Sequence, residues 1–319
     1  MNLTRTHKQQ ITDAVNSWID EKNPARSGNK LAEKTGINNA YISKIKNGTY
    51  EIEVGNGRLS QISDAYFHRI ADAIGIRFDG QLHWDFINNF KTIQRACRKA
   101  QKNAIREVIQ GWTGMGKTYA LESYAMTNDY VLYVKATQNM SSKDLLDTIL
   151  DKMGVHNPVR GNHSKLEMIK RAINARKGWL IIIDETEVVR PGIYTVLKDI
   201  SDWTQNKAGF IICGMDLIDK LDKLASRNRS GFPQLRRRFF GNKIVTASRL
   251  SENEIVQVCD HEGISNKGAQ NVLAEYVTDL DMLAQYVADI KDWQKANEKK
   301  ITGNEVIQLF SLNNLSKAA

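Results

Sequence analysis

One short stretch of the chain combines the residue types that bind phosphate. Residues 111–118 read Gly-Trp-Thr-Gly-Met-Gly-Lys-Thr, which is a glycine, four free positions, then Gly-Lys-Thr. Glycines allow a backbone to wrap closely around an anion with its N–H groups pointing inward. In such a loop Lys117 reaches the β- and γ-phosphates, and the Thr118 hydroxyl holds Mg²⁺. The stretch therefore predicts a site for ATP and Mg²⁺, against the alternative of a glycine-rich turn.

A second group of candidate residues follows later in the chain. Residues 179–185 are an apolar run that ends in two acids, Asp184 and Glu185. A carboxylate after an apolar strand is suited to hold Mg²⁺ together with Thr118, and Glu185 to orient or deprotonate the attacking water. The alternative is two exposed acids at a strand end. The predicted nucleotide contacts are Gly111, Thr113, Gly114, Met115, Gly116, Lys117, Thr118, Tyr119 and Asp184, with Thr118 and Asp184 as metal ligands.

These residues need a strand before the loop, a helix after it, and a sheet that brings the acidic strand alongside. Strands are expected at 104–110, 130–135, 179–185, 209–213 and 243–246, and helices at 119–126, 141–153, 164–176 and 191–204. Continuous apolar strands that alternate with helices predict an α/β fold with a five-stranded parallel sheet covered on both faces. Four more helices, expected at 252–262, 266–277, 279–295 and 303–313, predict a small helical lid domain.

The first 78 residues predict a separate, all-α domain. Helices are expected at 6–21 and at 59–76, the latter with Leu59 on its core face, and a polar loop or wing at 51–58. Residues 30–48 resemble the helix-turn-helix of phage repressor-like proteins, with Gly36 at the left-handed turn. The outward-facing residues predicted to contact DNA are Asn38, Asn39, Ser43 and Lys44. An ordinary helical hairpin is the alternative.

The charge balance favours a polyanionic partner. The 319-residue chain has a net charge of +9 and a pI near 9.3. Residues 220–249 contain 9 Lys/Arg and 1 Asp/Glu, and residues 91–102 contain 5 Lys/Arg and no acid. The basic side chains predicted to follow a DNA backbone are Lys220, Lys223, Arg227 and Arg229. A solvated basic face is the alternative for each cluster.

Other features bound the class of protein. No apolar run reaches the length of a membrane span, and the polar N-terminus does not read as a signal peptide. Three cysteines lie far apart, which indicates a reducing compartment without a disulfide framework or zinc site. The sequence thus predicts a cytoplasmic protein with a helix-turn-helix domain (1–78), a linker and basic helix (79–103), a nucleotide-binding core (104–249) and a helical lid (250–319).

The loop at 111–118, the strand at 181–185 and the strand at 209–213 together resemble the AAA+ ATPases. The N-terminal helix-turn-helix, the lone ATPase module and the total length are similar to the transposon target-selection ATPases typified by the B protein of phage Mu (MuB). The resemblance implies an arginine that reaches the γ-phosphate of the neighbouring subunit, for which Arg238 and then Arg237 are the candidates. It also implies a polar sensor residue after the fourth strand, where this chain reads Gly214-Met215-Asp216, and a lid arginine, which residues 279–282 lack. Both departures predict slow hydrolysis, with ATP acting as an assembly switch.

Three functions are compatible with these features. The first is a transposition accessory ATPase that assembles on double-stranded DNA, through an ATP-dependent oligomer or helical filament, and delivers target DNA to an integrase-type transposase. The second is a replication initiator or helicase loader. The third is a helix-turn-helix repressor with a nucleotide-sensing domain. A repressor is expected to bind one operator without ATP, whereas the first type is expected to bind any duplex and to require ATP.

Overall fold

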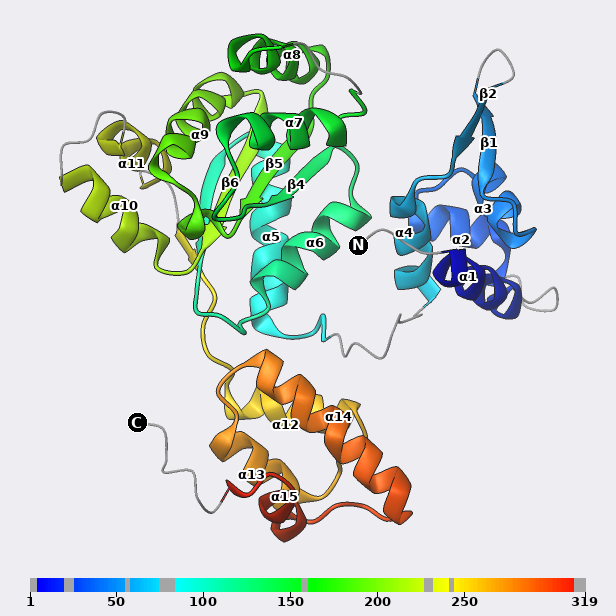
Figure 1. Ribbon diagram of the computed structural model, residues 1–319. Coiled ribbons are helices and arrows are strands. Elements are labelled where there is room, and N and C mark those ends of the chain that lie inside the picture. Colours follow the sequence, from blue (N-terminus) through cyan, green and yellow to red (C-terminus); the bar gives the residue numbers. More distant parts are fainter. Residues whose placement is uncertain are drawn as a thin grey trace. The chain divides into compact units, whose positions relative to one another are not determined.

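The computed structural model describes residues 5–19, 26–54, 58–74, 84–155, 160–226, 232–240 and 244–312 (Figure 1). The chain divides into two compact units, one of residues Met1–His83 with Ala125–Asp129 and one of residues Trp84–Tyr124 with Tyr130–Ala319. The predicted end of the N-terminal domain at residue 78 and the first residues of the linker, 79–83, lie outside the described residues. Among the described residues, no helix combines the length and the apolarity that a membrane crossing requires.

The described part of the N-terminal unit contains four helices. They are α1 Arg5–Trp18, α2 Gly28–Thr35, α3 Asn39–Lys46 and α4 Asp64–Ile74. Leu31, Ile42 and Ile45 are fully or almost fully buried in one core with residues of α1 and α4. The turn between α2 and α3 carries Gly36 at a φ of 67°, a left-handed conformation that glycine adopts without strain. Helices α2 and α3 thus pack together across a left-handed turn, and their assignment as a DNA-binding helix-turn-helix stays a prediction.

The prediction of an all-α N-terminal domain is wrong in one place. Strands β1 (Glu51–Val54) and β2 (Arg58–Gln61) form an antiparallel hairpin where a loop and the start of a helix were expected. Leu59 lies on β2 with 69% of its surface exposed, so it does not belong to a helical core face. The expected helix begins only at Asp64, because Leu59 and Ile62 fit a helical repeat by chance while the residues between them pair with β1.

The larger unit is organised around a five-stranded parallel sheet in the order β4-β5-β6-β3-β7. The strands are β3 Arg106–Gln110, β4 Val131–Lys135, β5 Trp179–Asp184, β6 Ala208–Gly214 and β7 Ile244–Thr246. Every residue of β6 is buried, which explains its unbroken run of small and apolar side chains. Because β3 lies beside β6, which in turn lies beside β5, the phosphate loop after β3 and the acids after β5 meet at one edge of the sheet.

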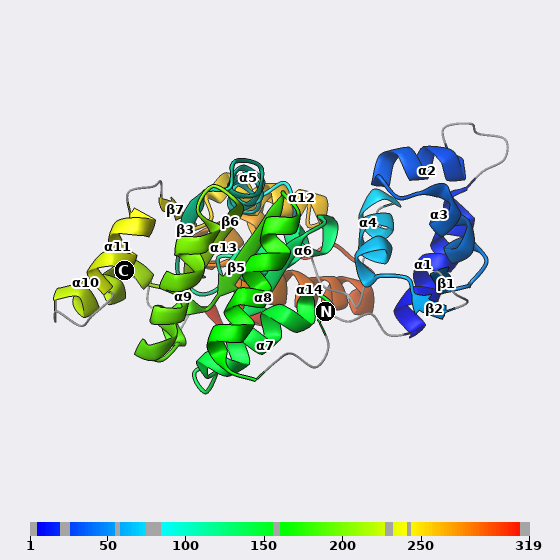
Figure 2. The ribbon, with the colours of Figure 1, turned by 90° about the horizontal axis from the view of Figure 1, so that it is seen from above.

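Helices cover both faces of this sheet. They are α5 Asn88–Asn103, α6 Lys117–Thr127, α7 Ser142–Lys152, α8 Asn162–Ala175, α9 Pro191–Thr204, α10 Leu217–Ser226 and α11 Phe232–Phe240. One apolar core joins the sheet to α5 and α6, and the other joins it to α7–α11. Figure 2 shows α5 on one face and α7, α8 and α9 on the other. The predicted α/β fold and its five parallel strands are confirmed.

Four helices follow the sheet, as predicted. They are α12 Glu252–His261, α13 Lys267–Tyr276, α14 Leu280–Asn297 and α15 Gly303–Leu309. Capping boxes at Ser251 and Thr302 satisfy the first backbone N–H groups of α12 and α15. The Trp84 indole N–H donates to Glu262 Oε1 at 2.9 Å, which ties the segment before α5 to the end of α12.

Candidate nucleotide site

The phosphate loop runs from the end of β3 to the start of α6 and carries two left-handed glycines. Gly114 has a φ of 78° and Gly116 a φ of 76°. Both glycines also face the lid closely. A Cβ at Gly114 would lie 2.7 Å from Asp279 Oδ1, and one at Gly116 would lie 2.8 Å from Leu280 Cδ1. The Leu280 N–H donates to the Gly114 carbonyl at 2.9 Å, so the first residue of α14 rests directly on the loop.

The backbone of the phosphate loop holds the ammonium group of Lys117. Its Nζ donates to the carbonyl oxygens of Gly111 and Trp112, both at 2.6 Å. Thr113 Oγ1 lies 3.7 Å from Met215 Sδ, just after β6. Trp112 exposes 61% of its surface. The ammonium group of Lys117 is thus positioned within the concave backbone where a phosphate chain would bind.

Asp184 and Thr118 meet as the sequence predicts. The Asp184 carboxylate is 1% exposed, and its Oδ2 accepts hydrogen bonds from Thr118 Oγ1 at 2.7 Å and from the Tyr133 hydroxyl at 2.9 Å. Its Oδ1 accepts from the Glu185 N–H at 2.9 Å. A hydroxyl and a carboxylate in contact are a donor set that suits Mg²⁺, a hard cation that prefers oxygen ligands. Burial and the neighbouring Asp184 raise the pKa of Tyr133, which therefore remains a neutral hydrogen-bond donor.

Glu185 follows Asp184 with a left-handed backbone, at a φ of 53°. Its Oε1 lies 3.1 Å from the ammonium of Lys135, the last residue of β4. The Glu185 side chain is 38% exposed. The hydrogen bond to this carboxylate is the main cause that raises the pKa of Lys135. The predicted water-handling carboxylate is therefore present at the edge of the site and is paired with a lysine that the sequence motifs do not include.

Asn89, a buried residue at the start of α5, belongs to no motif and was not predicted to matter. Its side-chain amide donates to the Ser248 carbonyl at 2.7 Å and to the Met115 carbonyl at 3.4 Å, and it accepts from the Ser248 N–H at 3.0 Å. Asn89 thereby joins the phosphate loop to the segment that leads into the lid. Tyr119, predicted to contact the nucleotide, packs its ring 5.7 Å from that of Phe90, so an aromatic pair lies where α5 and α6 meet.

The comparisons with known proteins agree with this geometry. Residues 107–221 match the family model described as AAA domain. That segment holds the phosphate loop, the strand that carries Asp184, and the strand between them in the sheet. These residues form an AAA ATPase domain. A search of curated protein sequences found no match.

Solved structures of other proteins are similar to this chain over about two thirds to three quarters of its length. A Walker-type ATPase of Pyrococcus abyssi is 11% identical at a TM-score of 0.51, over 74% of this chain and 75% of its own. Cdc6p of Pyrobaculum aerophilum is 16% identical at a TM-score of 0.50, over 67% of this chain and 62% of its own. The RuvB Holliday junction branch migration motor of Thermotoga maritima is 14% identical at a TM-score of 0.49, over 72% of this chain and 70% of its own. At these identities the similarity to the Pyrococcus and Pyrobaculum proteins shows the fold alone.

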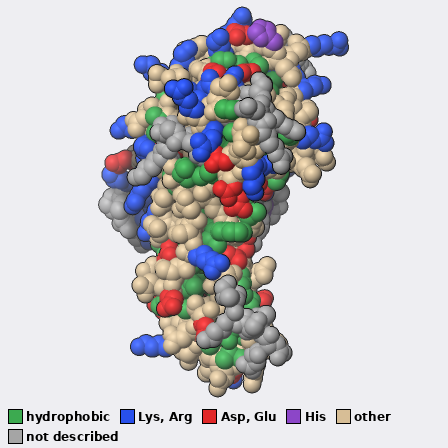
Figure 3. All heavy atoms as spheres, turned by 90° about the vertical axis from the view of Figure 1, so that its left-hand side faces the viewer, with side chains coloured by type: hydrophobic (Ala, Val, Ile, Leu, Met, Phe, Trp, Pro, Cys, Tyr) green, Lys and Arg blue, Asp and Glu red, His purple; other side chains and the backbone are tan. Residues whose placement is uncertain are grey.

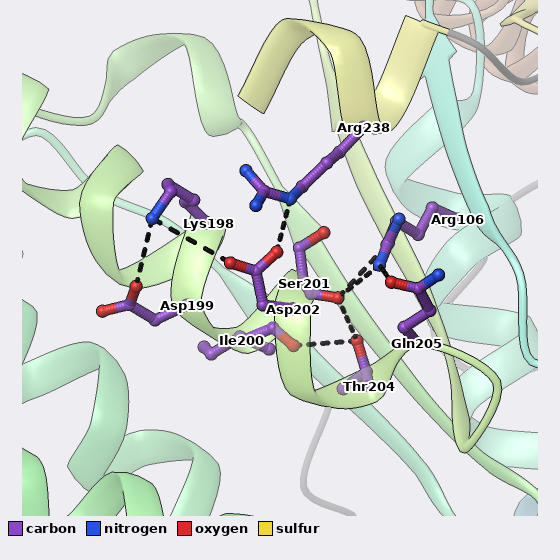
Figure 4. A network of polar contacts seen from close by, with 9 residues as sticks. All are labelled: Arg106, Lys198, Asp199, Ile200, Ser201, Asp202, Thr204, Gln205 and Arg238. Atoms are coloured by element: carbon purple, nitrogen blue, oxygen red, sulfur yellow. Dashed lines mark hydrogen bonds and ion pairs between the residues drawn. The ribbon is translucent and has the colours of Figure 1, made fainter. Parts of the chain in front are cut away.

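The three arginines near the end of α11 differ in their surroundings. Arg238 forms an ion pair with Asp202 of α9, close to Arg106 of β3, which donates to the Ser201 carbonyl at 2.7 Å (Figure 4). Arg236 forms an ion pair with Asp222 of α10. Arg237 is exposed, and no hydrogen bond or ion pair joins it to the part of the chain that the structure describes. Of the two arginines predicted to act on a neighbour, Arg238 is thus engaged within its own subunit.

The predicted DNA contacts of α3 are exposed or partly exposed, and three of them have local partners. Asn38 caps α3 by accepting from the Ala40 N–H at 2.9 Å. Asn39 donates to Asn29 Oδ1 at 2.7 Å, and Lys44 donates to the Glu51 carbonyl at 3.3 Å. Ser43 is exposed. All four residues therefore lie on or next to one short helix, with Asn38 committed to capping.

The basic residues after β6 are less uniform than their sequence count implies. Lys220 is partly buried and donates to the Glu187 carbonyl, whereas Lys223 is exposed. Arg227 and Arg229 lie outside the described residues. Asp219 and Asp222 alternate with the two lysines along α10. Figure 3 accordingly shows basic side chains spread over this face of the molecule, with acidic and apolar side chains among them.

Proposed function

We propose that this protein is an ATP-dependent DNA-binding ATPase that assembles on duplex DNA and serves transposition. In this role it selects target DNA and delivers it to a transposase of the integrase type. The observation that carries the ATPase part is the hydrogen bond from Thr118 to the buried Asp184 beside Lys117. The transposition part is supported by the order of the modules, a helix-turn-helix followed by a single AAA domain.

Each residue of the site has its own role in ATP hydrolysis. Lys117 and the N–H groups of the loop bind the phosphates, and they neutralise part of the negative charge there. Thr118 and Asp184 would hold Mg²⁺, which supplies Lewis-acid stabilisation of the phosphate oxygens when it is bound. Glu185 orients the attacking water. The proton given up by that water leaves through the Glu185 carboxylate, which is open to solvent.

Self-association follows from the exposed arginine of α11. Arg237 is exposed, and in this proposal it enters the site of a neighbouring copy, where its charge would stabilise the γ-phosphate. Arg238 and Arg236 support this arrangement by fixing α11 to α9 and α10. A head-to-tail contact of this kind generates a ring or a helical filament, depending on whether the rotation closes.

Two surfaces are available for DNA in this proposal. The exposed side of α3 offers Asn39 and Ser43 to a groove, and a single such module makes few contacts. Lys223, with Arg227 and Arg229, would recur along the backbone of bound DNA in an assembly. Binding through repeated phosphate contacts is independent of sequence and falls steeply with salt.

The test is binding of the full chain to one random duplex at several salt concentrations, with ATP, with ADP and without nucleotide. The proposal expects ATP-dependent binding. Lys223→Ala, Arg227→Ala and Arg229→Ala each remove one phosphate interaction and are each expected to reduce the salt slope by roughly 0.9. Lys117→Ala is expected to abolish the ATP dependence. Binding to a single operator without ATP would favour a repressor, and dependence on a replication origin would favour an initiator or helicase loader.

A further inference from the structure

The end of β6 has an unusual neighbour. Gly214, its last residue, has no side chain, and a Cβ at this position would overlap Oε2 of Glu187. The Glu187 carboxylate thus occupies the space that a side chain at residue 214 would fill. Asp216, the other acid nearby, is exposed and lines a surface hollow with residues of α10. A polar group is therefore present beside the phosphate loop at the end of β6, but it comes from a different element.

Glu187 lies on the short 3₁₀ helix η2 (Thr186–Val188), which follows Glu185. The backbone of η2 is anchored on both sides. Thr186 donates through Oγ1 to the Ile183 carbonyl at 2.8 Å, and the Tyr194 hydroxyl donates to the Thr186 carbonyl at 2.8 Å. Lys220 Nζ donates to the Glu187 carbonyl. These contacts fix the direction in which the Glu187 side chain leaves the backbone.

One oxygen of this carboxylate is buried without a partner. Oε2 of Glu187 has no hydrogen-bond donor among the described residues. A buried polar atom of this kind is unfavourable unless a ligand or water satisfies it. Burial and the negative charge of Asp184 raise the pKa of Glu187, while backbone hydrogen bonds and the positive charge of Lys117 lower it. The carboxylate is therefore close enough to the phosphate-binding lysine for their charges to interact.

We propose that Glu187 is a second carboxylate of the nucleotide site. It takes the place of the polar side chain missing at Gly214 and accepts a hydrogen bond from the water that attacks the γ-phosphate. The water oxygen forms a bond to the γ-phosphorus as the bond from that phosphorus to the bridging oxygen of ADP breaks. The water proton passes to Glu185, so Glu187 holds the water without becoming protonated itself. This assignment rests on the ATPase function and adds a residue to it.

The first test compares hydrolysis and binding in the full chain. Glu187→Gln keeps the shape of the side chain and is expected to lower kcat about 100-fold or more while ATP still binds. The matched control is Glu167→Gln, an acid of α8 paired with Lys170, which is expected to hydrolyse ATP at the parent rate. Parent-like hydrolysis in Glu187→Gln overturns the proposal. If Lys117→Ala also hydrolyses like the parent, the ATPase site itself is misassigned.

A second test separates a role at the γ-phosphate from a purely structural one. An anionic carboxylate facing the γ-phosphate weakens the binding of ATP more than that of ADP. Glu187→Ala is therefore expected to increase the affinity for ATP by about threefold or more relative to the affinity for ADP. Titration calorimetry with each nucleotide measures this ratio. The double variant Glu187→Ala with Gly214→Asn returns a polar group to the vacated space and is expected to recover part of kcat. Equal changes in ATP and ADP affinity, without recovery in the double variant, would show that Glu187 only supports the fold.

Discussion

The ammonium of Lys135 lies 3.1 Å from Oε1 of Glu185, across the ends of two neighbouring parallel strands. The carboxylate expected to handle water is therefore held in an ion pair before any substrate arrives. The pair is half exposed, so it contributes about 0–1 kcal/mol. An interaction of this size restrains Glu185 and can be broken by substrate binding or by a neighbouring subunit.

Lys135→Met is expected to raise the basal rate of ATP hydrolysis by up to about fivefold. The substitution keeps most of the side-chain volume and removes the charge, so Glu185 no longer spends time paired with it. Steady-state phosphate release at saturating ATP measures the change. Lys143→Met, an exposed lysine at the start of α7, is the matched control and is expected to have no effect. A rate that falls instead would mean that Lys135 helps to place Glu185.

Glu185→Gln is expected to bind ATP like the parent and to lose hydrolysis by about 10²- to 10⁴-fold. The amide keeps the shape of the side chain but cannot take the proton of the attacking water. Single-turnover hydrolysis and nucleotide affinity, measured on the same preparation, separate the two effects. Parent-like hydrolysis would remove Glu185 from its assigned role and leave Glu187 as the remaining candidate.

Arg237→Ala is expected to retain nucleotide binding and to lose both ATP-induced oligomers and hydrolysis. Mixing it with Lys117→Ala tests action between subunits, since the second variant lacks a working site but still carries Arg237. Recovery of hydrolysis in the mixture is the expected result. Arg171→Ala on α8 serves as the exposed control. If Arg238→Ala loses hydrolysis while Arg237→Ala does not, the order first predicted from the sequence is correct.

The hydrogen bonds of Glu262 predict how the free energy of unfolding depends on pH. Burial opposes the charged form of Glu262, but hydrogen bonds from Lys291, Trp84 and His261 outweigh burial and lower its pKa to about 2. This pKa lies below the ordinary value of 4.5. The stabilisation of the fold by the ionised Glu262 is therefore complete above about pH 4.5 and disappears as the pH falls toward 2. Glu262→Gln is expected to cost about 1–3 kcal/mol of unfolding free energy at pH 7 and less at pH 3.

Urea unfolding at the two pH values measures this difference. Glu252→Gln, an exposed acid in the first turn of α12, is the control and is expected to show a small effect at both. An equal cost of Glu262→Gln at pH 7 and pH 3 would contradict the assignment, because at pH 3 residue 262 is protonated in the unfolded chain and part of the stabilisation by the carboxylate should already be lost.

The ATPase core was predictable because its strands are buried on both faces and its loop has a fixed spacing. Few structures other than a buried strand fit the unbroken apolar run of β5. Few other than a phosphate loop fit the eight residues from Gly111 to Thr118. The hairpin of the N-terminal unit was not predictable in the same way, since its strands are only four residues each and are mostly polar. Short polar strands leave no strong periodic signal.

Within the site, sequence reasoning identified residues that lie in motifs and missed those that arrive from elsewhere. Thr118 and Asp184 were found because each follows a recognisable element. Asn89, Lys135 and Glu187 were not found, because their roles depend on which strands and helices are neighbours in the folded sheet. Arg237 and Arg238 are adjacent in the sequence, and only the ion pair to Asp202 distinguishes them.

The close approach of α14 to the phosphate loop affects how variants of that loop should be interpreted. No methyl group fits at Gly114 or Gly116 while Asp279 and Leu280 remain in place. An alanine at either glycine would therefore push the lid away from the core as well as distort the phosphate cradle. Loss of activity in such a variant would not distinguish weakened nucleotide binding from a displaced lid. Lys117 and Thr118 are cleaner positions for dissecting this enzyme, because their side chains bond to the loop and to Asp184 rather than to the lid.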